Sequence, residues 1–237
     1  MPIELTEDSK YIIAFMEEKF AKFEEKMTSI VNSKNEEIKS LRSEVASLNK
    51  EVAELKNRID ENDAYERRDT LIFSGSSIPS AQTGEICSNS LVNLLRDKIK
   101  INISPNEISV VHRLGAKPAA QTDDKRPIIA KFCRRDLKKE VLMTARRARE
   151  PNFFVNESLT PGRKIIFNTL RSMRRDSPDL LKGVTTYDGK VYAYTKPVSP
   201  NSNRDQKHYI ANQSDLVSFC REHIKKPIEN FLSSAQV

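Results

Sequence analysis

The sequence predicts an α+β protein with three parts: an N-terminal parallel coiled coil, a βαββαβ domain and a small α+β C-terminal domain. An apolar repeat of heptad spacing predicts the coiled coil at residues 38–64. Alternating strand and helix patterns predict the second part at residues 65–158, and a helix, a hairpin and another helix predict the third at residues 159–226. We expect residues 1–37 to be a weaker helical extension of the rod and residues 227–237 to be a frayed tail.

The coiled-coil prediction depends on a seam of mostly apolar residues that alternates spacings of three and four without a slip. Neither Pro nor Gly interrupts it, and the residues between are mostly charged or polar. Such a stripe buries its surface against another helix of the same kind, so it predicts oligomerisation. The alternative is one long amphipathic helix packed on its own globular domain. The a and d positions are Ile38, Leu41, Val45, Leu48, Val52, Leu55, Ile59 and Asn62.

A weaker apolar repeat precedes this seam. Phe20, Phe23, Met27 and Ile30 repeat at three, four and three, but their phase differs from the Ile38 register by a four-residue insertion. We therefore expect a locally unwound continuation of the rod. The alternative is that these side chains fold back as a separate helix.

The charge of the chain is unevenly distributed. Residues 1–64 hold 10 Lys and Arg against 15 Asp and Glu, whereas the remainder holds 30 against 18. A basic body on an acidic rod favours a polyanionic partner, with nucleic acid first and an acidic membrane surface second. The alternative is a generally soluble basic protein. Three widely spaced cysteines suit a reducing compartment, and neither a signal peptide nor a membrane-spanning segment is expected.

In the second part, strands are predicted at residues 70–75, 108–114, 127–132 and 153–155, with helices at 84–100 and 134–150. Strand alternation places the larger apolar side chains inward and leaves Ile72, Ile129 and Lys131 outward. No aromatic residue is among these three. The inward set is Leu71, Phe73, Ile128, Ala130 and Phe132.

The third part is predicted to begin at Thr160-Pro161 with a helix over residues 162–176. Strands at 184–187 and 190–194 flank Asp188-Gly189, a hairpin turn signal. A polar loop over 196–206 and a helix from Asp215 to about His223, capped by Ser214, complete it.

Motifs of catalysis are absent from the sequence. The six glycines form neither GxGxxG nor a Walker pattern, and no GxSxG occurs. Cys220 and His223 share a helix face at i, i+3, but a structural zinc needs two further ligands, and the candidates are scattered. We expect an ordinary buried cysteine and a surface histidine, and neither enzymatic activity nor a cofactor nor a metal.

Two consecutive helices carry many cations and few acids, which suits bidentate contact with phosphates. The alternative for each residue is an ordinary solvated basic face. The candidate nucleic-acid contacts on these helices are Arg134, Arg135, Arg146, Arg147, Arg163, Lys164 and Arg171.

Several motifs together resemble a known family. ERRDTLIFSG at residues 66–75, SVVHRLG at 109–115, RPIIAKF at 126–132 and LTPGRK at 159–164 follow a coiled coil. This arrangement resembles the first-open-reading-frame protein of LINE-type non-LTR retrotransposons, or a domesticated relative. That family binds RNA, packages its own transcript in a ribonucleoprotein and acts as a nucleic-acid chaperone. It combines a trimeric coiled coil, a noncanonical RNA-recognition (RRM-like) domain and a small C-terminal domain.

The resemblance implies that this chain is a homotrimer that binds single-stranded RNA, with single-stranded DNA as a second ligand, in cytoplasmic ribonucleoprotein particles and also in the nucleus. It implies RNA contacts at Arg113, Arg126, Lys131, Arg147 and Arg163, with Arg146 or Arg149 as alternatives to Arg147. No membrane partner is expected.

Two questions stay open at this point. Val or Ile at a with Leu at d favours two strands, but Arg58-Ile59 followed by Asn62-Asp63 resembles the trimer-specifying arrangement of the family. We expect a trimer, with a dimer as the alternative. The alternative function is a structural or adaptor protein whose globular domains bind another protein.

Contacts in the expected complex would be chiefly to phosphates. We expect the strand to lie between the two folded parts, with Arg126 and Lys131 on one side. Arg146 and Arg147 would form the edge, and Arg163, Lys164 and Arg171 the other side.

Overall fold

The computed structural model describes residues 6–82, 84–117, 124–196 and 205–224. It divides into two compact units, Met1–Lys56 and Asn57–Val237. The predicted tail at residues 227–237 and most of the loop predicted at 196–206 lie outside the described residues.

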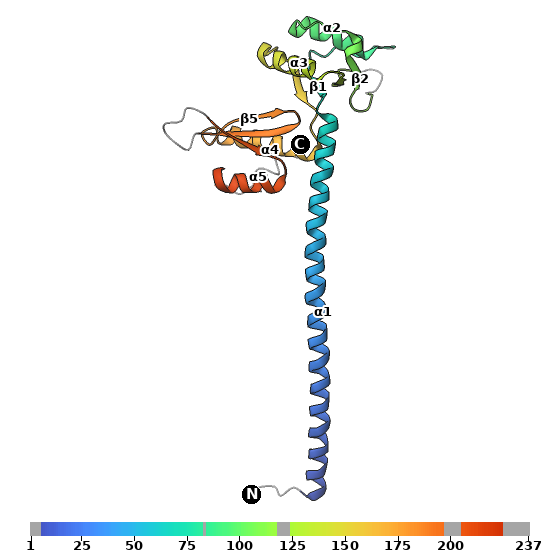
Figure 1. Ribbon diagram of the computed structural model, residues 1–237, viewed down its shortest axis with the longest axis vertical. Coiled ribbons are helices and arrows are strands. Elements are labelled where there is room, and N and C mark those ends of the chain that lie inside the picture. The colour runs from blue at the N-terminus through green and yellow to red at the C-terminus, as the bar shows by residue number, and fades with distance from the viewer. Residues whose placement is uncertain (1–5, 83, 118–123, 197–204, 225–237) are drawn as a thin grey trace. The chain divides into compact units, whose positions relative to one another are not determined.

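The N-terminal rod is one uninterrupted α-helix, α1 (Glu7–Arg67) (Figure 1). A rise of about 1.5 Å per residue makes it roughly 90 Å long. The helix continues through residue 37 without a break, so the residues before it do not form a separate folded-back helix. Only Ala64 is buried, and the seam residues from Ile38 to Ile59 each leave between 46% and 62% of their surface exposed.

The α+β class and the βαββαβ order are confirmed. The strands β1 (Thr70–Ser74), β2 (Ile108–Arg113), β3 (Ile128–Phe132) and β4 (Phe154–Glu157) form an antiparallel sheet in the order β2-β3-β1-β4. The helices α2 (Cys87–Ile99) and α3 (Arg135–Ala148) supply the apolar residues that pack on it. A short 3-10 turn, Pro105–Glu107, precedes β2.

Strand alternation decides which side chains face these helices. The predicted inward set is fully buried, with Phe73 and Phe132 at 0% and 2% exposure. Ile72 and Ile129 are half-buried and Lys131 is exposed, as predicted. The last strand begins at Phe154 rather than Phe153, because its backbone pairs with β1 over residues 154–157. Within this segment Phe153 is buried and Phe154 is exposed.

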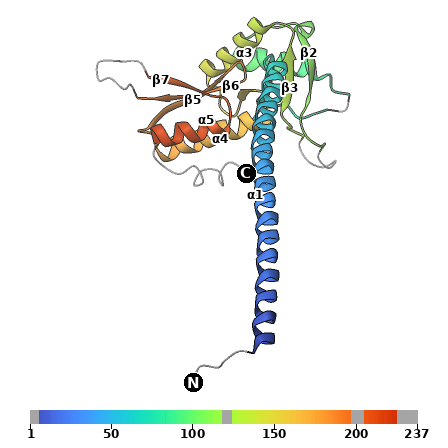
Figure 2. The same cartoon turned by 60° about the horizontal axis from the view of Figure 1, so that its bottom comes forward.

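The C-terminal domain packs two helices against one face of a second antiparallel sheet. It comprises α4 (Pro161–Asp176), β5 (Leu181–Tyr187), β6 (Lys190–Thr195), β7 (Gln206–Ile210) and α5 (Gln213–Phe219), which continues as a π-helical turn, Cys220–Ile224. Figure 2 shows α4 and α5 on the same side of the strands. Asp188 and Gly189 take positive φ values of 49° and 73°, which confirms the predicted hairpin turn.

Two predictions in this domain are wrong. The third strand, β7, was not expected, because its residues Gln206, Lys207 and His208 are polar and only pairing with β6 makes them a strand. The helix α5 is capped by Asn212 rather than Ser214, since the Asn212 side-chain oxygen accepts from the backbone N–H of Asp215 at 3.0 Å.

Candidate nucleic-acid interface

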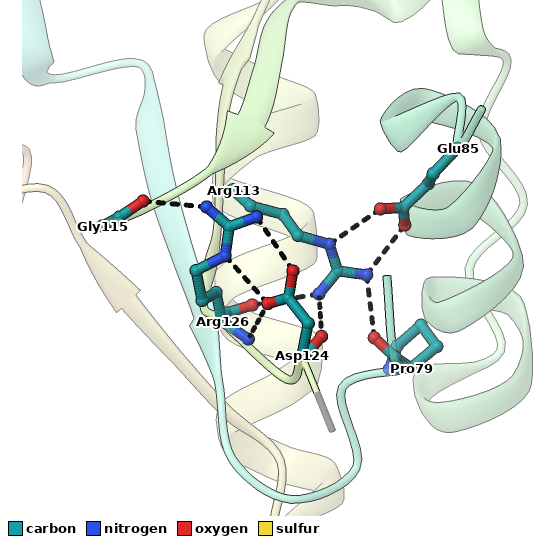
Figure 3. Close-up of polar contacts among 6 residues, drawn as sticks. All are labelled: Pro79, Glu85, Arg113, Gly115, Asp124 and Arg126. Atoms are coloured by element: carbon teal, nitrogen blue, oxygen red, sulfur yellow. Dashed lines mark hydrogen bonds and ion pairs between the residues drawn. The ribbon is translucent and has the colours of Figure 1, made fainter. Parts of the chain in front are cut away.

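Arg113 ends β2 with its guanidinium enclosed by acceptors (Figure 3). Its Nε and Nη2 donate to the two carboxylate oxygens of Glu85, at 2.8 Å each. Nη2 also donates to the Pro79 carbonyl at 2.8 Å, and Nη1 donates to the carbonyls of Asp124 and Arg126 at 3.3 and 3.2 Å. The Arg113 side chain is 4% exposed, so the network ties two loop segments, the one before α2 and the one before β3, to the end of β2.

This arrangement corrects the role expected for Arg113. A guanidinium has five N–H donors, and each of the five contacts above takes one. No donor is left for a phosphate, and burial keeps a ligand away from the group. Arg113 therefore positions the loops around it. Its hydrogen bonds to Glu85, more than charge attraction alone, hold the pKa of that carboxyl below its ordinary value.

Arg126 is held by the same loop but remains partly accessible. Its Nε and Nη2 donate to the two oxygens of Asp124 at 2.8 and 2.9 Å, and Nη1 donates to the Gly115 carbonyl at 2.8 Å. These bonds lower the pKa of the Asp124 carboxyl. The Arg126 side chain is 23% exposed. Because Asp124 offsets its charge, Arg126 attracts a phosphate less than an unpaired cation would.

The outward face of the first sheet carries one strong candidate. Lys131 is exposed and has no acidic partner within the described part of the chain. Ile72 and Ile129 lie beside each other on the same face, so β1 and β3 lack outward aromatics there, as predicted. Phe154 of β4 lies opposite Ser74 on this face and is 56% exposed. The sequence prediction considered outward aromatics only on the first and third strands and therefore did not include Phe154 of the fourth.

The basic helix α3 contains both paired and unpaired cations. Arg134 forms a two-point ion pair with Asp136, which lowers the pKa of that carboxyl to about 2, and the Arg134 side chain remains 63% exposed. Arg135 donates to Asp69 at 3.2 Å and is 37% exposed. Arg147 is exposed and lacks an acidic partner among the residues that the structure describes. It is thus the most available arginine of this helix.

Two other cations of α3 connect it to the C-terminal domain. Lys138, 1% exposed, pairs with Glu157 of β4 and lies 3.6 Å from Asp188 in the β5–β6 turn. Arg146 donates to the carbonyl and hydroxyl oxygens of Thr186 at 3.3 and 3.2 Å. These contacts hold the β5–β6 hairpin against α3, so part of the Arg146 guanidinium is already occupied.

Arg163, expected to contact RNA, is buried instead. Its Nε donates to Asp60 of α1 at 2.7 Å, and its Nη1 donates to the Gly189 carbonyl at 3.1 Å. With the side chain at 4% exposure, Arg163 joins α1, α4 and the β5–β6 turn. Lys164 and Arg171 of the same helix are exposed, with no acidic partner in the described ranges. Arg163 therefore cannot form a side of the expected groove in this arrangement.

The Cys220–His223 pair has the surroundings of a packed interior. Cys220 is 2% exposed, its Sγ lies 3.7 Å from the Met173 sulfur, and burial raises its pKa to about 11. His223 packs against the rings of His208 and Phe219, with centroids 4.4 and 5.0 Å away. Among the described residues, no cluster of three or more His, Cys, Asp and Glu has the geometry for a metal ion.

Comparison with known proteins adds no relative: neither a family model nor a curated protein matches this chain. Within the described ranges, every helix is too short or too polar to cross a bilayer.

Proposed function

We propose that this chain is an oligomeric single-stranded RNA-binding protein and nucleic-acid chaperone of the kind that its motifs resemble. In this proposal α1 forms a parallel coiled coil, and the first sheet with α2 and α3 is a noncanonical RRM-like domain. The protein would coat RNA in a cytoplasmic ribonucleoprotein particle, also found in the nucleus, and would bind single-stranded DNA as well.

One observation carries the proposal: the basic half of the chain leaves several cations exposed without acidic partners among the described residues. Residues 65–237 hold 30 Lys and Arg against 18 Asp and Glu. The buried Arg113 and Arg163 pair with acidic residues. Four exposed cations have no acidic partner among the described residues and can contact phosphates: Lys131, Arg147, Lys164 and Arg171. Such contacts bind the backbone of any sequence, which gives low specificity and strong dependence on salt.

The exposed seam supports the oligomer. Seven apolar a and d residues, Ile38 to Ile59, are about half exposed in a single chain. Leaving this stripe in water is unfavourable, at roughly 25 cal/mol per Å² of apolar surface, and a coiled coil removes it. We propose a trimer, with a dimer as the alternative. Joining several RNA sites raises the local concentration of sites, while each weak contact can still exchange, as a chaperone requires.

The RNA-binding test compares Lys131→Gln/Arg147→Gln with a matched control, Lys19→Gln/Lys26→Gln, which removes two exposed cations from the rod. Binding of a mixed-sequence RNA is followed by fluorescence anisotropy at several salt concentrations. For single strands the slope of log K against log salt changes by about 0.7 per phosphate contact. The slope should therefore be smaller by roughly 1.4 in the first variant and unchanged in the control. Equal slopes for both variants would remove these residues from the interface. Failure of the parent to bind RNA would remove the function and favour the adaptor alternative.

The oligomer test uses light scattering of the full chain. Leu48→Asp/Leu55→Asp places charges in the seam and should yield monomers. Ser43→Asp/Ser47→Asp, at outward heptad positions, should keep the parent mass. A monomeric parent at micromolar concentration would refute the coiled coil.

A further inference from the structure

The outward face of the second sheet gathers four of the six tyrosines of the chain. In its ladders Tyr192 lies opposite Tyr209, Tyr194 opposite Lys207, and Tyr187 opposite Lys190. Residues opposite each other in a ladder share a face, and alternation puts these residues on one side. We call the set Tyr187, Lys190, Tyr192, Tyr194, Lys207 and Tyr209 the tyrosine–lysine face.

The opposite side of this sheet forms the hydrophobic core. Val191, Ala193 and Ile210 are buried there, against Leu170 of α4 and Leu216 of α5. Since both helices cover that side, the core does not bury the tyrosine–lysine face. Tyr187 and Tyr209 are 48% and 41% exposed.

The geometry of the face suits flat ligands that carry negative charge. The Tyr192 and Tyr209 rings lie 5.6 Å apart between centroids, with 43° between their planes. The Lys207 ammonium lies 3.9 Å from the Tyr192 ring centroid, and the Lys190 ammonium lies 5.4 Å from that of Tyr209. Tyr192 and Tyr209 are thus each accompanied by a lysine ammonium, and aromatic rings beside cations are the combination with which proteins bind single-stranded nucleic acid.

Of the acidic groups near this face, Asp188 and Asp60 are already paired with cations, whereas Glu61 of α1 lies close enough to Tyr209 to add, after burial, to the raised pKa of that tyrosine. Asp188, at the hairpin turn next to Tyr187, lies 3.5 Å from the Lys139 ammonium and 3.6 Å from Lys138. Lys139 also lies 5.0 Å from the Tyr187 ring centroid, so α3 adds a cation at the edge of the face. With Lys139, Lys190 and Lys207 beside the rings, the local charge favours an anionic ligand.

We propose that the tyrosine–lysine face is a base-stacking platform for single-stranded nucleic acid, an inference that rests on the function proposed above. Successive bases would stack on Tyr209, Tyr192 and their neighbours, while Lys190 and Lys207 leave the rings to contact phosphates. The face supplies the aromatic surface that β1 and β3 lack. Stacking tolerates any base, so this site adds affinity without sequence preference.

A purely structural role makes a different prediction. Cross-strand tyrosine and lysine pairs also stabilise a sheet, but that role would not distinguish a ligand with bases from one without them. The test therefore compares two ligands on the full chain: a labelled oligothymidylate and an abasic phosphodiester chain of the same length. The chain contains no Trp, so tyrosine fluorescence is measured directly on the parent protein. Oligothymidylate should quench this fluorescence and, at about tenfold for each base stacked on one of two rings, bind on the order of a hundredfold more tightly than the abasic chain.

Substitutions then locate the effect. Tyr192→Leu/Tyr209→Leu should bind oligothymidylate on the order of a hundredfold more weakly, at about tenfold per stacked base, and should bind the abasic chain as the parent does. Tyr192→Phe/Tyr209→Phe keeps both rings and should restore the difference. Tyr11→Leu is the matched control, because Tyr11 is an exposed tyrosine of the rod.

The outcomes separate this inference from the proposed function. A parent that binds both ligands equally and shows no quenching would overturn the platform and leave phosphate binding intact. A parent that binds neither ligand would overturn both proposals. If a folded Tyr192→Leu/Tyr209→Leu variant still bound oligothymidylate more tightly than the abasic chain, the bases would stack on other residues. Phe154 of the first sheet would then be the next position to test. Loss of self-association in that variant, with RNA binding unchanged, would identify the face as a contact between copies of the chain.

Discussion

Replacing Arg113 with methionine tests whether this arginine is structural. Methionine keeps most of the length and removes every donor. Glu85, 12% exposed, would lose its partner, and the Pro79, Asp124 and Arg126 carbonyls would each lose a hydrogen bond. Breaking a buried ion pair by removing one partner typically costs about 3–5 kcal/mol. That is a large share of a total stability of about 5–15 kcal/mol.

The pH dependence gives a sharper test than the magnitude. In the parent the pKa of Glu85 is lowered, so the stability it contributes is present above its ordinary pKa of about 4.5 and is lost as pH falls through the lower folded value. Without Arg113, burial would raise the pKa of this carboxyl, and the penalty would grow as pH rises. Without its partner, the buried Glu85 carboxyl can take up a proton instead of carrying a charge, so the cost of protonating it is the most that its charge can cost. From its ordinary pKa of about 4.5, that cost is about 3.4 kcal/mol at pH 7 and about 0.7 kcal/mol at pH 5.

We therefore expect Arg113→Met to lower the free energy of unfolding by about 3–5 kcal/mol at pH 7, and by about 2–3 kcal/mol less at pH 5. The lower end of the first range is expected, since Glu85 retains some water. Urea denaturation followed by circular dichroism at both pH values measures the difference. The control is Lys131→Met on the adjacent strand, which is exposed and should change stability by less than about 0.5 kcal/mol. An Arg113→Met protein as stable as the parent, or equally destabilised at both pH values, would refute the assigned role.

Three other predictions concern the core, the α1–α4 junction and the histidine cluster. Phe132→Ala should lower the free energy of unfolding by about 3–5 kcal/mol, because this ring is buried in the first core; a parent-like urea midpoint would contradict its placement. Arg163→Ala should lower the melting temperature by leaving Asp60 without its ion pair, whereas Lys164→Ala should mainly reduce the salt dependence of RNA binding; the reverse result would exchange their roles. Burial, then the charge of His223, lowers the pKa of His208, so stability should be lost as pH falls below about 6.5. In His208→Phe the melting temperature should differ less between pH 7.5 and pH 5.5 than it does in the parent. An unchanged difference would mean that another group causes the loss of stability at low pH.

Much of the architecture follows from periodicity, which is a local property of the sequence. The heptad spacing of Ile38 to Ile59 predicted the helix, and alternation in β1 and β3 predicted the buried faces of Phe73 and Phe132. Each pattern repeats within a few residues, so it needs no knowledge of what the element packs against. The polar strand β7 has no such pattern and was missed, since its strand conformation depends on pairing with β6.

For the candidate site too, some features follow from the sequence and others only from the tertiary structure. The sequence by itself determined that the C-terminal half is basic and which helices carry the arginines. It could not separate Arg113 from Lys131, or Arg163 from Lys164, because composition does not say which cation has an acidic partner. The partner of Arg113 is 28 residues away and that of Arg163 is 103 residues away. Only the tertiary structure brings such charges together, and burial then turns two expected phosphate contacts into structural ion pairs.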